Sequence, residues 1–489
     1  MQAGPKSPQD LVYMQPSTSE TQRALCIDLD GTLLRTDLLH EAVLALLSRN
    51  LLYLFVLPLW LLKGKAPFKR EIARRVRIAP ETLPYDERVL EWLRTTSQRP
   101  RVLCTASDVL LAEPIARHLG LFEEVMASDG RTNLGGSAKA AMLVERFGTR
   151  GFDYAGNTLV DMKVWAHAAT AIVVNAPGRL ARAASKVTQL AGHLARTPPT
   201  LRAWIKALRL HQWLKNLLIF VPLLTAHRFL DPAAITQAAG AFLAFGLCAS
   251  GTYILNDLLD LSADRVHPRK RLRPFASGAI PIKYGLLAIP LMMLASVAVA
   301  LAINPVFLLA LLGYCIMTLG YSFRLKRIIM VDVVMLAALY TVRIIAGAMA
   351  IDQTLSFWLL AFSMFIFLSL ALLKRYTELE GLRTSGKQKA VGRGYATADL
   401  PLLQSLGAAA GYISVLVLAL YINSEESVAL YSRPQMLWLL CPLLLYWISR
   451  AWIIAHRNQM HDDPVVFAAT DRVSQVIGLL VVVVALAAL

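Results

Sequence analysis

An Asp-rich segment, residues 256–274, carries the strongest sign of chemistry in the sequence. Asp257, Asp260 and Asp264 follow Asn256 at spacings of one, three and four, which on a helix places the four side chains on one side. Neighbouring carboxylates repel one another unless a cation lies between them. Mg²⁺ is a hard cation that takes one or two carboxylates plus phosphate oxygens, so the spacing predicts a magnesium site.

The second half of the Asp-rich segment is basic. Lys270 and Arg273 can hold the outer oxygens of a diphosphate that is bound to the metal. The alternative is a solvated loop whose basic residues lie on anionic lipid. The segment matches the signature NDxxDxxxDxxHPxKxxRP of the UbiA superfamily at every fixed position. From residue 212 onward the chain therefore resembles a UbiA-type membrane transferase.

Within that superfamily, the chain resembles most the subfamily that makes polyprenyl-phosphoryl phosphoribose. The stretches that carry this resemblance are Arg209–Asn216, Tyr321–Lys326, Asp332 with Arg343 and Gly347, Lys374–Leu379, Asp462–Pro464 and Asp471–Arg472. The resemblance implies Mg²⁺ ligation by Asn256, Asp257, Asp260 and Asp264. It implies substrate-binding roles for Lys215, Asn216, Lys270, Arg273, Tyr321, Lys326, Arg343, Lys374 and Arg375.

One departure bears on the substrate. Aromatic prenyltransferases of the superfamily carry a second acidic motif, DxxxD, near the loop between the fourth and fifth spans. Here that stretch has Arg324 and Lys326, followed by the single acid Asp332. A phosphate site at these two cations is more natural than a second metal-diphosphate site.

Two charges fall inside apolar runs. Arg343 lies midway along the expected fifth span, where an isolated charge costs several kcal/mol. We expect it to face a cavity, and a purely structural ion pair is the alternative. Lys215, near a helix end, fits snorkelling to the membrane surface and phosphate binding equally well.

The N-terminal half carries a second group of reactive side chains. Asp28 and Asp30 follow the apolar run 24–27, Thr105 ends a second strand-like run at 101–105, and Lys139 opens a helical stretch. A third strand-like run, starting at Phe152, is followed by Asn157 and Asp161. Strand-then-loop units separated by helical stretches predict a parallel α/β sheet with a site at the carboxyl ends of its strands.

These residues, in this order, resemble the four motifs of haloacid dehalogenase (HAD) phosphatases. By that resemblance, Asp28 attacks phosphorus and Asp30 serves as acid and base, while Thr105 and Lys139 hold phosphoryl oxygens. Asp28, Asn157 and Asp161 would bind Mg²⁺. The family usually has Asp where this chain has Asn157, which weakens the expected hold on Mg²⁺. A docking domain without turnover is the alternative to an active phosphatase.

Between the first two HAD-like motifs lies a cap region, about residues 38–98, with the continuous apolar run 51–62. Twelve residues are too few to span a bilayer, and a single crossing would separate Asp28 from Thr105. The run is therefore either monotopic, with nearby lysines at the lipid headgroups, or a buried cap helix. We expect membrane contact.

The membrane half predicts about nine spans: 212–228, 235–255, 284–303, 305–321, 331–350, 356–373, 402–422, 434–452 and 474–489. The loops expected on the cytoplasmic side carry 18 Lys and Arg residues, and the opposite connections carry two. Such a bias is the positive-inside signal. It predicts a multi-pass protein of the inner membrane with a cytoplasmic N-terminus.

Composition agrees with two domains. Of the 489 residues, 56% are hydrophobic, which is too many for one soluble globule. Residues 1–20 are expected to be disordered and contain no signal peptide, 21–195 form the HAD-like Rossmannoid domain, 196–211 a linker, and 212–489 an all-α membrane bundle. The five isolated cysteines fit a reducing compartment. The net charge of +17 is assigned to membrane topology and not to nucleic acid.

The sequence thus predicts a bifunctional enzyme. The membrane half would transfer phosphoribose from phosphoribosyl pyrophosphate to a polyprenyl phosphate, and the HAD-like half would remove the 5-phosphate from the lipid product. The alternative keeps the fold but transfers a prenyl group from its diphosphate to a 4-hydroxybenzoate-like acceptor, with an inactive or docking HAD-like module.

Overall fold

The computed structural model of the chain describes residues 23–96, 99–386, 393–460 and 463–489. The expected disordered tail, residues 1–20, lies outside these ranges. The chain divides into two compact units. Unit 1 comprises Met1–Leu208 and Tyr253–Ile289, and unit 2 comprises Arg209–Thr252 and Pro290–Leu489. The Asp-rich segment therefore belongs to unit 1.

Unit 1 is built on a six-stranded parallel sheet, as the sequence predicts. Its strands are β1 (Ala24–Asp28), β2 (Arg101–Asp108), β3 (Glu124–Ser128), β4 (Phe152–Gly156), β5 (Thr170–Ala176) and β6 (Gln189–Ala195), in the order β3-β2-β1-β4-β5-β6. In the register, Ile27 of β1 is level with Leu103 of β2 and Ala155 of β4. The direction of strand order changes beside β1, which is where open parallel sheets bind their ligands.

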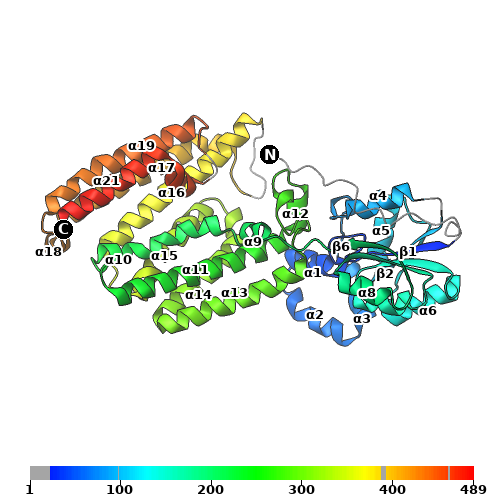
Figure 1. The fold of residues 1–489 in the computed structure, drawn as a ribbon. Helices are drawn as coiled ribbons and strands as arrows, with labels where there is room; N and C mark the ends of the chain where they lie inside the picture. The colour runs from blue at the N-terminus through cyan, green and yellow to red at the C-terminus, as the bar shows by residue number, and fades with distance from the viewer. Residues whose placement is uncertain (1–22, 97–98, 387–392, 461–462) are drawn as a thin grey trace. The chain divides into compact units, whose positions relative to one another are not determined.

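Helices cover both faces of this sheet (Figure 1). Leu25 and Ile27 of β1 belong to one hydrophobic core, with α4 (Glu87–Thr95) and α5 (Val109–Leu119). Ala24 and Cys26 belong to the other core, with α6 (Gly136–Phe147) and α8 (Gly178–Ala184). Because alternate residues of a strand point to opposite faces, a strand covered on both sides reads as a continuous apolar run.

The cap region folds as helices between β1 and β2. They are α1 (Leu38–Arg49), α2 (Tyr53–Leu62) and α3 (Lys65–Ala73), followed by the 3₁₀ turn η2 (Pro80–Thr82) and α4. Asp37 caps α1, its Oδ1 accepting from the backbone N–H of Leu39 at 2.9 Å. The other short elements of the sheet domain are η3 (Leu159–Asp161), α7 (Met162–Trp165) and α9 (Leu201–Leu208).

Unit 2 is helical. Its long helices are α14 (Pro305–Phe323), α15 (Val331–Ala350), α16 (Phe357–Thr384), α17 (Leu400–Ile422), α19 (Leu440–His456) and α21 (Arg472–Ala488). Helices α11 (Pro232–Leu259) and α13 (Ile282–Ile303) begin or end in unit 1. Its short elements are η4 (Leu210–Phe220), α10 (Val221–Thr225), η6 (Leu325–Arg327), η7 (Thr397–Asp399), α18 (Glu425–Leu430), η8 (Pro434–Leu439) and α20 (Pro464–Thr470).

The described residues contain seven helices long and apolar enough to cross a membrane, or eight if α20 and α21, bent by 79°, form one span. Nine spans, as expected from the sequence, are therefore not confirmed. The difference is the segment 212–228, which is not one helix: the 3₁₀ run η4 is followed by the five-residue α10. Pro222 interrupts the run, and the buried polar residues Lys215 and Asn216 lie in η4.

Candidate functional site

Asp28 lies at the carboxyl end of β1, where it is buried. Lys139 of α6 reaches it, with its Nζ 2.7 Å from Asp28 Oδ1. The same Nζ donates to the carbonyl of Cys104 at 3.2 Å and to Tyr154 Oη at 2.8 Å. Burial raises the pKa of Asp28 to about 7, against the opposing effect of Lys139. Burial alone would lower the pKa of Lys139, but Asp28 and Asp161 raise it above its ordinary value.

Asp30 is the second carboxylate of this site. Its Oδ2 accepts from Thr105 Oγ1 at 3.2 Å and from Ser107 Oγ at 2.8 Å, and its Oδ1 accepts from the N–H of Leu38 at 2.7 Å. Burial raises the pKa of Asp30, which suits a group that gives and takes a proton. The four predicted residues Asp28, Asp30, Thr105 and Lys139 are thus brought together at one edge of the sheet.

Asn157 and Asp161 follow β4 at the same edge. Asp161 Oδ2 accepts from the N–H of Asn157 and from both the N–H and the hydroxyl of Thr158, at 2.8–3.0 Å. Asp161 Oδ1 accepts from Tyr154 Oη at 3.1 Å. Asp161 therefore anchors the loop that carries Asn157. Asn157 Oδ1 is buried and has no hydrogen-bond partner among the described residues.

This donor set fits Mg²⁺. The unpartnered Asn157 Oδ1 and the carboxylate of Asp28 are hard oxygen donors, as that ion prefers. Gly31 has a φ of +76°, and a Cβ at this position would come within 2.0 Å of Asn157 Nδ2. Only glycine therefore lets the loop after Asp28 approach the Asn157 amide this closely. Across the described residues, no three His, Cys, Asp or Glu side chains form a ready metal cluster.

The Asp-rich segment is not one continuous helix, which corrects the expectation that its four side chains share one side. Helix α11 ends at Leu259 and α12 (Leu261–Val266) begins two residues later, so Asp260 falls at the break and is exposed. Asp257 and Asp264 are buried. The structure thus brings two of the three carboxylates together and leaves the third in solvent.

Arg273 lies between the two buried carboxylates. Its Nη1 is 3.1 Å from Asp257 Oδ1 and 2.6 Å from Asp264 Oδ2. Sequence reasoning assigned Arg273 to diphosphate oxygens, but its partners here are these acids. Two carboxylates that share one guanidinium nitrogen lie close enough together to be bridged by a divalent cation, so the pair fits Mg²⁺. Lys270 is exposed and begins η5 (Lys270–Leu272). His267 Nδ1 accepts from the backbone N–H of Arg269 at 3.2 Å and from that of Lys270 at 3.3 Å.

Unit 2 holds most of the other predicted binding residues, in three groups. In the first group, Asp463 Oδ2 accepts from Lys215 Nζ at 2.6 Å and from Lys374 Nζ at 3.3 Å. Burial alone would raise the pKa of Asp463, but Lys374 and Lys215 hold it well below its usual range. Asp463 was not among the predicted site residues, although the pair Asp463–Pro464 belongs to the resemblance.

In the second group, Arg343 donates from Nε to Asn216 Oδ1 at 2.9 Å and from Nη2 to Tyr314 Oη at 3.0 Å. It also donates to the carbonyl of Leu339. Its guanidinium lies over the rings of Tyr314 and Tyr340, 4.9 and 5.8 Å from their centroids. These partners are all neutral, so within the described residues Arg343 is held by hydrogen bonds and aromatic rings.

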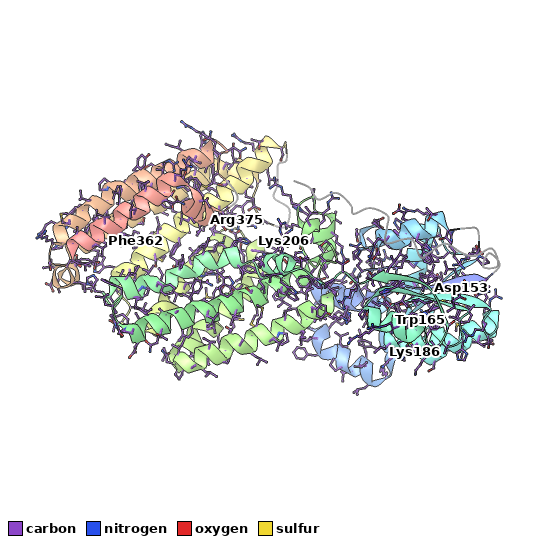
Figure 2. All side chains as sticks on the ribbon, in the orientation of Figure 1. Asp153, Trp165, Lys186, Lys206, Phe362 and Arg375 are labelled. Carbon is purple, nitrogen blue, oxygen red and sulfur yellow. The ribbon has the colours of Figure 1, made fainter. Side chains whose placement is uncertain are left out.

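The third group surrounds Arg375 of α16, which is labelled in Figure 2. It donates from Nε to Asp332 Oδ2 at 2.6 Å, from Nη2 to Tyr321 Oη at 3.2 Å, and from Nη1 to Glu378. Asp332 also accepts from Tyr395 Oη at 3.1 Å. Arg375 and Asp332 are buried partners, and Lys326 lies in η6 and is half-buried.

Sequence reasoning missed Ser107, Tyr154, Asp463 and Glu41. Ser107 lies two residues after Thr105 and carries a hydroxyl, which is the one local signal that could have found it. Tyr154 lies inside an apolar strand and Asp463 contacts residues far away in the chain, so no local pattern marks either. Glu41 contacts Arg265 and is described below.

Comparison with known proteins identifies the same family that the Asp-rich segment resembles. The model of the UbiA prenyltransferase family matches residues 217–486. The uncharacterized protein y4nM of Sinorhizobium fredii is 37% identical over 465 residues, which are 94% of this chain and 89% of that protein. A decaprenyl-phosphate phosphoribosyltransferase of Mycolicibacterium smegmatis is 34% identical over 213 residues, 42% of this chain and 66% of that protein.

Among solved structures, a UbiA homolog from Archaeoglobus fulgidus bound to GPP and Mg²⁺ is 19% identical. The match covers 58% of this chain and 96% of that one, with a TM-score of 0.45. The family match spans more than half of the chain and includes its long apolar helices and the whole Asp-rich segment. This chain is a polytopic membrane protein and belongs to the UbiA prenyltransferase family.

Proposed function

We propose that the UbiA part of the chain transfers phosphoribose from phosphoribosyl pyrophosphate to a polyprenyl phosphate, with Mg²⁺ at the Asp-rich segment. The name of the Mycolicibacterium smegmatis relative supports this choice of substrates. So does the state of Asp332, the observation that carries the choice. Both of its oxygens accept hydrogen bonds, from Arg375 and Tyr395, and Arg375 is only 1% exposed whereas Arg273 is 26% exposed, so Asp332 is a poorer metal ligand than the two buried acids of the Asp-rich segment.

Asp257 and Asp264, together with the exposed Asp260, would hold Mg²⁺, which supplies charge neutralisation for the departing diphosphate. Arg273 lies on the same two carboxylates and would turn to the diphosphate when the metal binds. Lys215 and Lys374, held by Asp463, are cations for the other phosphate groups of the substrates. The acceptor phosphate is already anionic and needs no general base. Catalysis then rests on positioning and electrostatics.

Product analysis tests this proposal directly. The purified full-length protein is offered phosphoribosyl pyrophosphate with a polyprenyl phosphate, or a polyprenyl diphosphate with 4-hydroxybenzoate. We expect a Mg²⁺-dependent lipid product from the first pair, detected by mass spectrometry. A product from the second pair alone would replace the proposal with the aromatic prenyltransferase alternative.

A second activity is favoured by the site at Asp28. We infer that the sheet domain is a HAD-like phosphatase that removes the 5-phosphate from the lipid product. The support is the convergence of Asp28, Asp30, Thr105 and Lys139, together with the unpartnered Asn157 Oδ1. Lys139 would hold a phosphoryl oxygen while Asp28 attacks phosphorus and Asp30 protonates the leaving oxygen. Release of inorganic phosphate from the purified lipid product tests this inference.

The proposed substrates place both activities at the cytoplasmic face of the inner membrane. Phosphoribosyl pyrophosphate is a soluble, highly charged molecule, and the basic loops predict a cytoplasmic N-terminus by the positive-inside bias. Labelling of an engineered cysteine in the sheet domain, from either side of sealed membranes, tests the orientation. Labelling from the periplasmic side would reverse it.

A further inference from the structure

Helix α2 of the cap presents an apolar surface to solvent. All ten of its residues are apolar or aromatic, all ten are described, and none is buried. Tyr53, Leu57 and Trp60 pack partly against the hydrophobic core that contains Leu25 and Ile27 of β1. The other side is open: Phe55 is 74% exposed and Leu62 is 84% exposed, with Leu54, Leu59 and Leu61 also exposed. A soluble domain rarely leaves such a patch bare, so it marks a contact surface.

Cations surround this helix. Residues 49–77 contain eight Lys and Arg residues and one acid, Glu71. Contacts place some of these cations beside α2: the guanidinium of Arg75 lies 4.5 Å from the ring centroid of Trp60, and Arg49 Nη1 donates to the carbonyl of Arg75 at 2.6 Å. An apolar helix flanked by Lys and Arg is the combination that lies in the headgroup region of an anionic bilayer.

The helix cannot cross the bilayer. Ten residues of helix are about 15 Å long, roughly half of the hydrocarbon thickness. Moreover, β1 before the cap and β2 after it are neighbours in one parallel sheet. The chain therefore returns to the side from which it came, and α2 can only lie in the interface.

The neighbours of α2 lead to the Asp28 site. Helices α1 and α3 precede and follow it, and their residues Leu39, Ala42, Lys69 and Ile72 line a small pocket together with Ser107, Asp108 and Leu111. The hydroxyl of Ser107 donates to Asp30. We propose that α2 docks into the interface of an anionic bilayer and brings the Asp28 site close to a phosphate monoester carried on a lipid. The choice of substrate rests on the proposed phosphatase, whereas the docking does not.

Spin labels in full-length protein in lipid nanodiscs test the docking. The label is placed by Phe55→Cys, with Glu91→Cys on the exposed side of α4 as the matched control, both in a Cys315→Ala background because the other four cysteines are buried. With phosphatidylglycerol present, we expect the label at 55 to be reached by oxygen and protected from an aqueous nickel chelate. The label at 91 should remain open to the chelate.

Two results would overturn the docking. Full access of the nickel chelate at residue 55 would show that α2 stays in water, and loss of access to both oxygen and chelate would show that protein covers it. Lys63→Gln with Lys65→Gln should reduce the protection in anionic nanodiscs more than in neutral ones. If docking is seen while no phosphate is released from the lipid product, docking stands and the proposed phosphatase fails.

A different observation, within unit 1, concerns Glu41 of the cap helix α1. Its two carboxylate oxygens accept from Arg265 Nη1 at 3.0 Å and Nη2 at 2.5 Å, and both side chains are only 6% exposed. Arg265 Nε donates to the carbonyl of Ala276, and Glu41 Oε1 also accepts from Thr36 Oγ1. The pair is bidentate and its charged groups are satisfied.

This ion pair joins the two candidate sites of unit 1. Arg265 directly follows Asp264 in the Asp-rich segment. On the other side, Thr36 bonds Glu41 through its hydroxyl and accepts from the N–H of Gly31, beside Asp30, at 3.1 Å. Further contacts hold the same segment against the N-terminal residues of unit 1: Lys206 Nζ donates to the carbonyl of Leu272 at 2.7 Å.

The geometry points to Glu41 as a positioning residue for the transferase, one that acts through Arg265 on the Asp264 carboxylate. By this inference the sheet domain also serves as a platform for the Asp-rich segment. The role of Asp264 in Mg²⁺ binding rests on the proposed function, but the packing of the segment against Glu41 does not. A loss of the Glu41 charge should loosen residues 261–281 and weaken their hold on the metal.

The test compares Glu41→Gln, Arg265→Gln and the double variant, with Glu71→Gln, which removes a more exposed ion pair with Arg75, as control. Removing one partner leaves a buried charge unpaired and destabilises the fold, while removing both relieves that cost. We expect Glu41→Gln to speed hydrogen exchange in residues 261–281 and to raise the half-saturating Mg²⁺ for transfer several-fold. The double variant should recover thermal stability but keep both defects.

A purely structural pair would behave differently. If the Mg²⁺ requirement and the exchange rates return to normal in the double variant together with stability, Glu41 has no positioning role. Unchanged exchange in Glu41→Gln would also overturn the inference. Where no transfer is measured even for the unaltered protein, the proposed function fails and the exchange rates alone decide on Glu41.

Discussion

Two buried carboxylate sites of unit 1 are neutralised by a protein cation in different ways. At Asp28 the cation is Lys139, whose side chain is 5% exposed and is held by the Cys104 carbonyl and Tyr154. At Asp257 and Asp264 the cation is Arg273, which is 26% exposed and follows a short 3₁₀ turn. A fixed lysine is a permanent part of a phosphate site, whereas an accessible arginine can give way to a metal.

The two sites also differ in what determines the positions of their carboxylates. Asp28 is at the end of a central strand, and the parallel sheet determines its position. Asp257 and Asp264 lie on either side of a helix break, and their separation depends on what holds them together. We therefore expect the first site to tolerate loss of metal structurally, and the second to depend on Arg273 or on Mg²⁺ for its geometry.

The largest effect should follow Asp28→Asn. The amide cannot attack phosphorus, so release of phosphate should fall about 1,000-fold or more. The rate of lipid product formation should stay unchanged, because Asp28 belongs to the other site, and the 5-phosphorylated product should accumulate. Both are measured on one reaction mixture by phosphate assay and mass spectrometry. Phosphate release that continues at the original rate would contradict the role of Asp28.

The next effect should separate Asp260 from Asp264. Asp260→Ala should lower transfer by roughly 100-fold, as expected for loss of one electrostatic contact to the reacting groups. Because Asp260 is exposed, the melting temperature should not change. Asp264→Ala should lower transfer similarly and also destabilise the protein, since it leaves Arg273 with one partner. Near-normal transfer by Asp260→Ala at saturating Mg²⁺ would remove Asp260 from the metal site.

A smaller effect concerns Arg273. Arg273→Gln removes the cation that Asp257 and Asp264 share, and loss of one member of an ion pair with buried carboxylates destabilises the fold. Because Mg²⁺ would replace the lost charge, the melting temperature of this variant should rise with Mg²⁺ far more than that of the unaltered protein. Arg271→Gln, at an exposed position of the same turn, is the control. An equal response of both variants to Mg²⁺ would argue against a metal at these carboxylates.

The sheet domain and its site were predictable because the carboxyl ends of parallel strands meet at one edge. That rule brings Asp28, Thr105 and Asn157 together independently of the conformation of the connecting loops. The Asp-rich segment was predictable in chemistry but not in shape, since nothing local marks the break at Asp260 or the return of Arg273. The contact of Lys215 with Asp463 joins residues 248 positions apart, and only the packing of the helices determines it.

The apolar helices of the membrane part were predictable from hydropathy, with one exception. The segment 212–228 is apolar enough to suggest a span, but Lys215 and Asn216 are buried and bonded to Asp463 and Arg343. Polar contacts and Pro222 thus shape it into a 3₁₀ run and a short helix. A hydropathy pattern does not report where such side chains point.

The smallest expected effect belongs to Asn157→Asp. Asn157 Oδ1 is a buried oxygen without a partner among the described residues, so an aspartate there would present a charged oxygen at an existing ligand position. The added charge strengthens the attraction for Mg²⁺, and the Mg²⁺ concentration needed for phosphate release should fall roughly several-fold. Without metal the new carboxylate would lie near Asp28 and Asp161, so the variant should melt at a lower temperature in chelator than in Mg²⁺.

Leu159→Asp, which adds the same charge at an exposed position two residues away, is the control. An equal Mg²⁺ requirement in both variants would place the metal away from Asn157. Phosphate release that appears only in Asn157→Asp would show that the natural asparagine had already turned the site into a docking module.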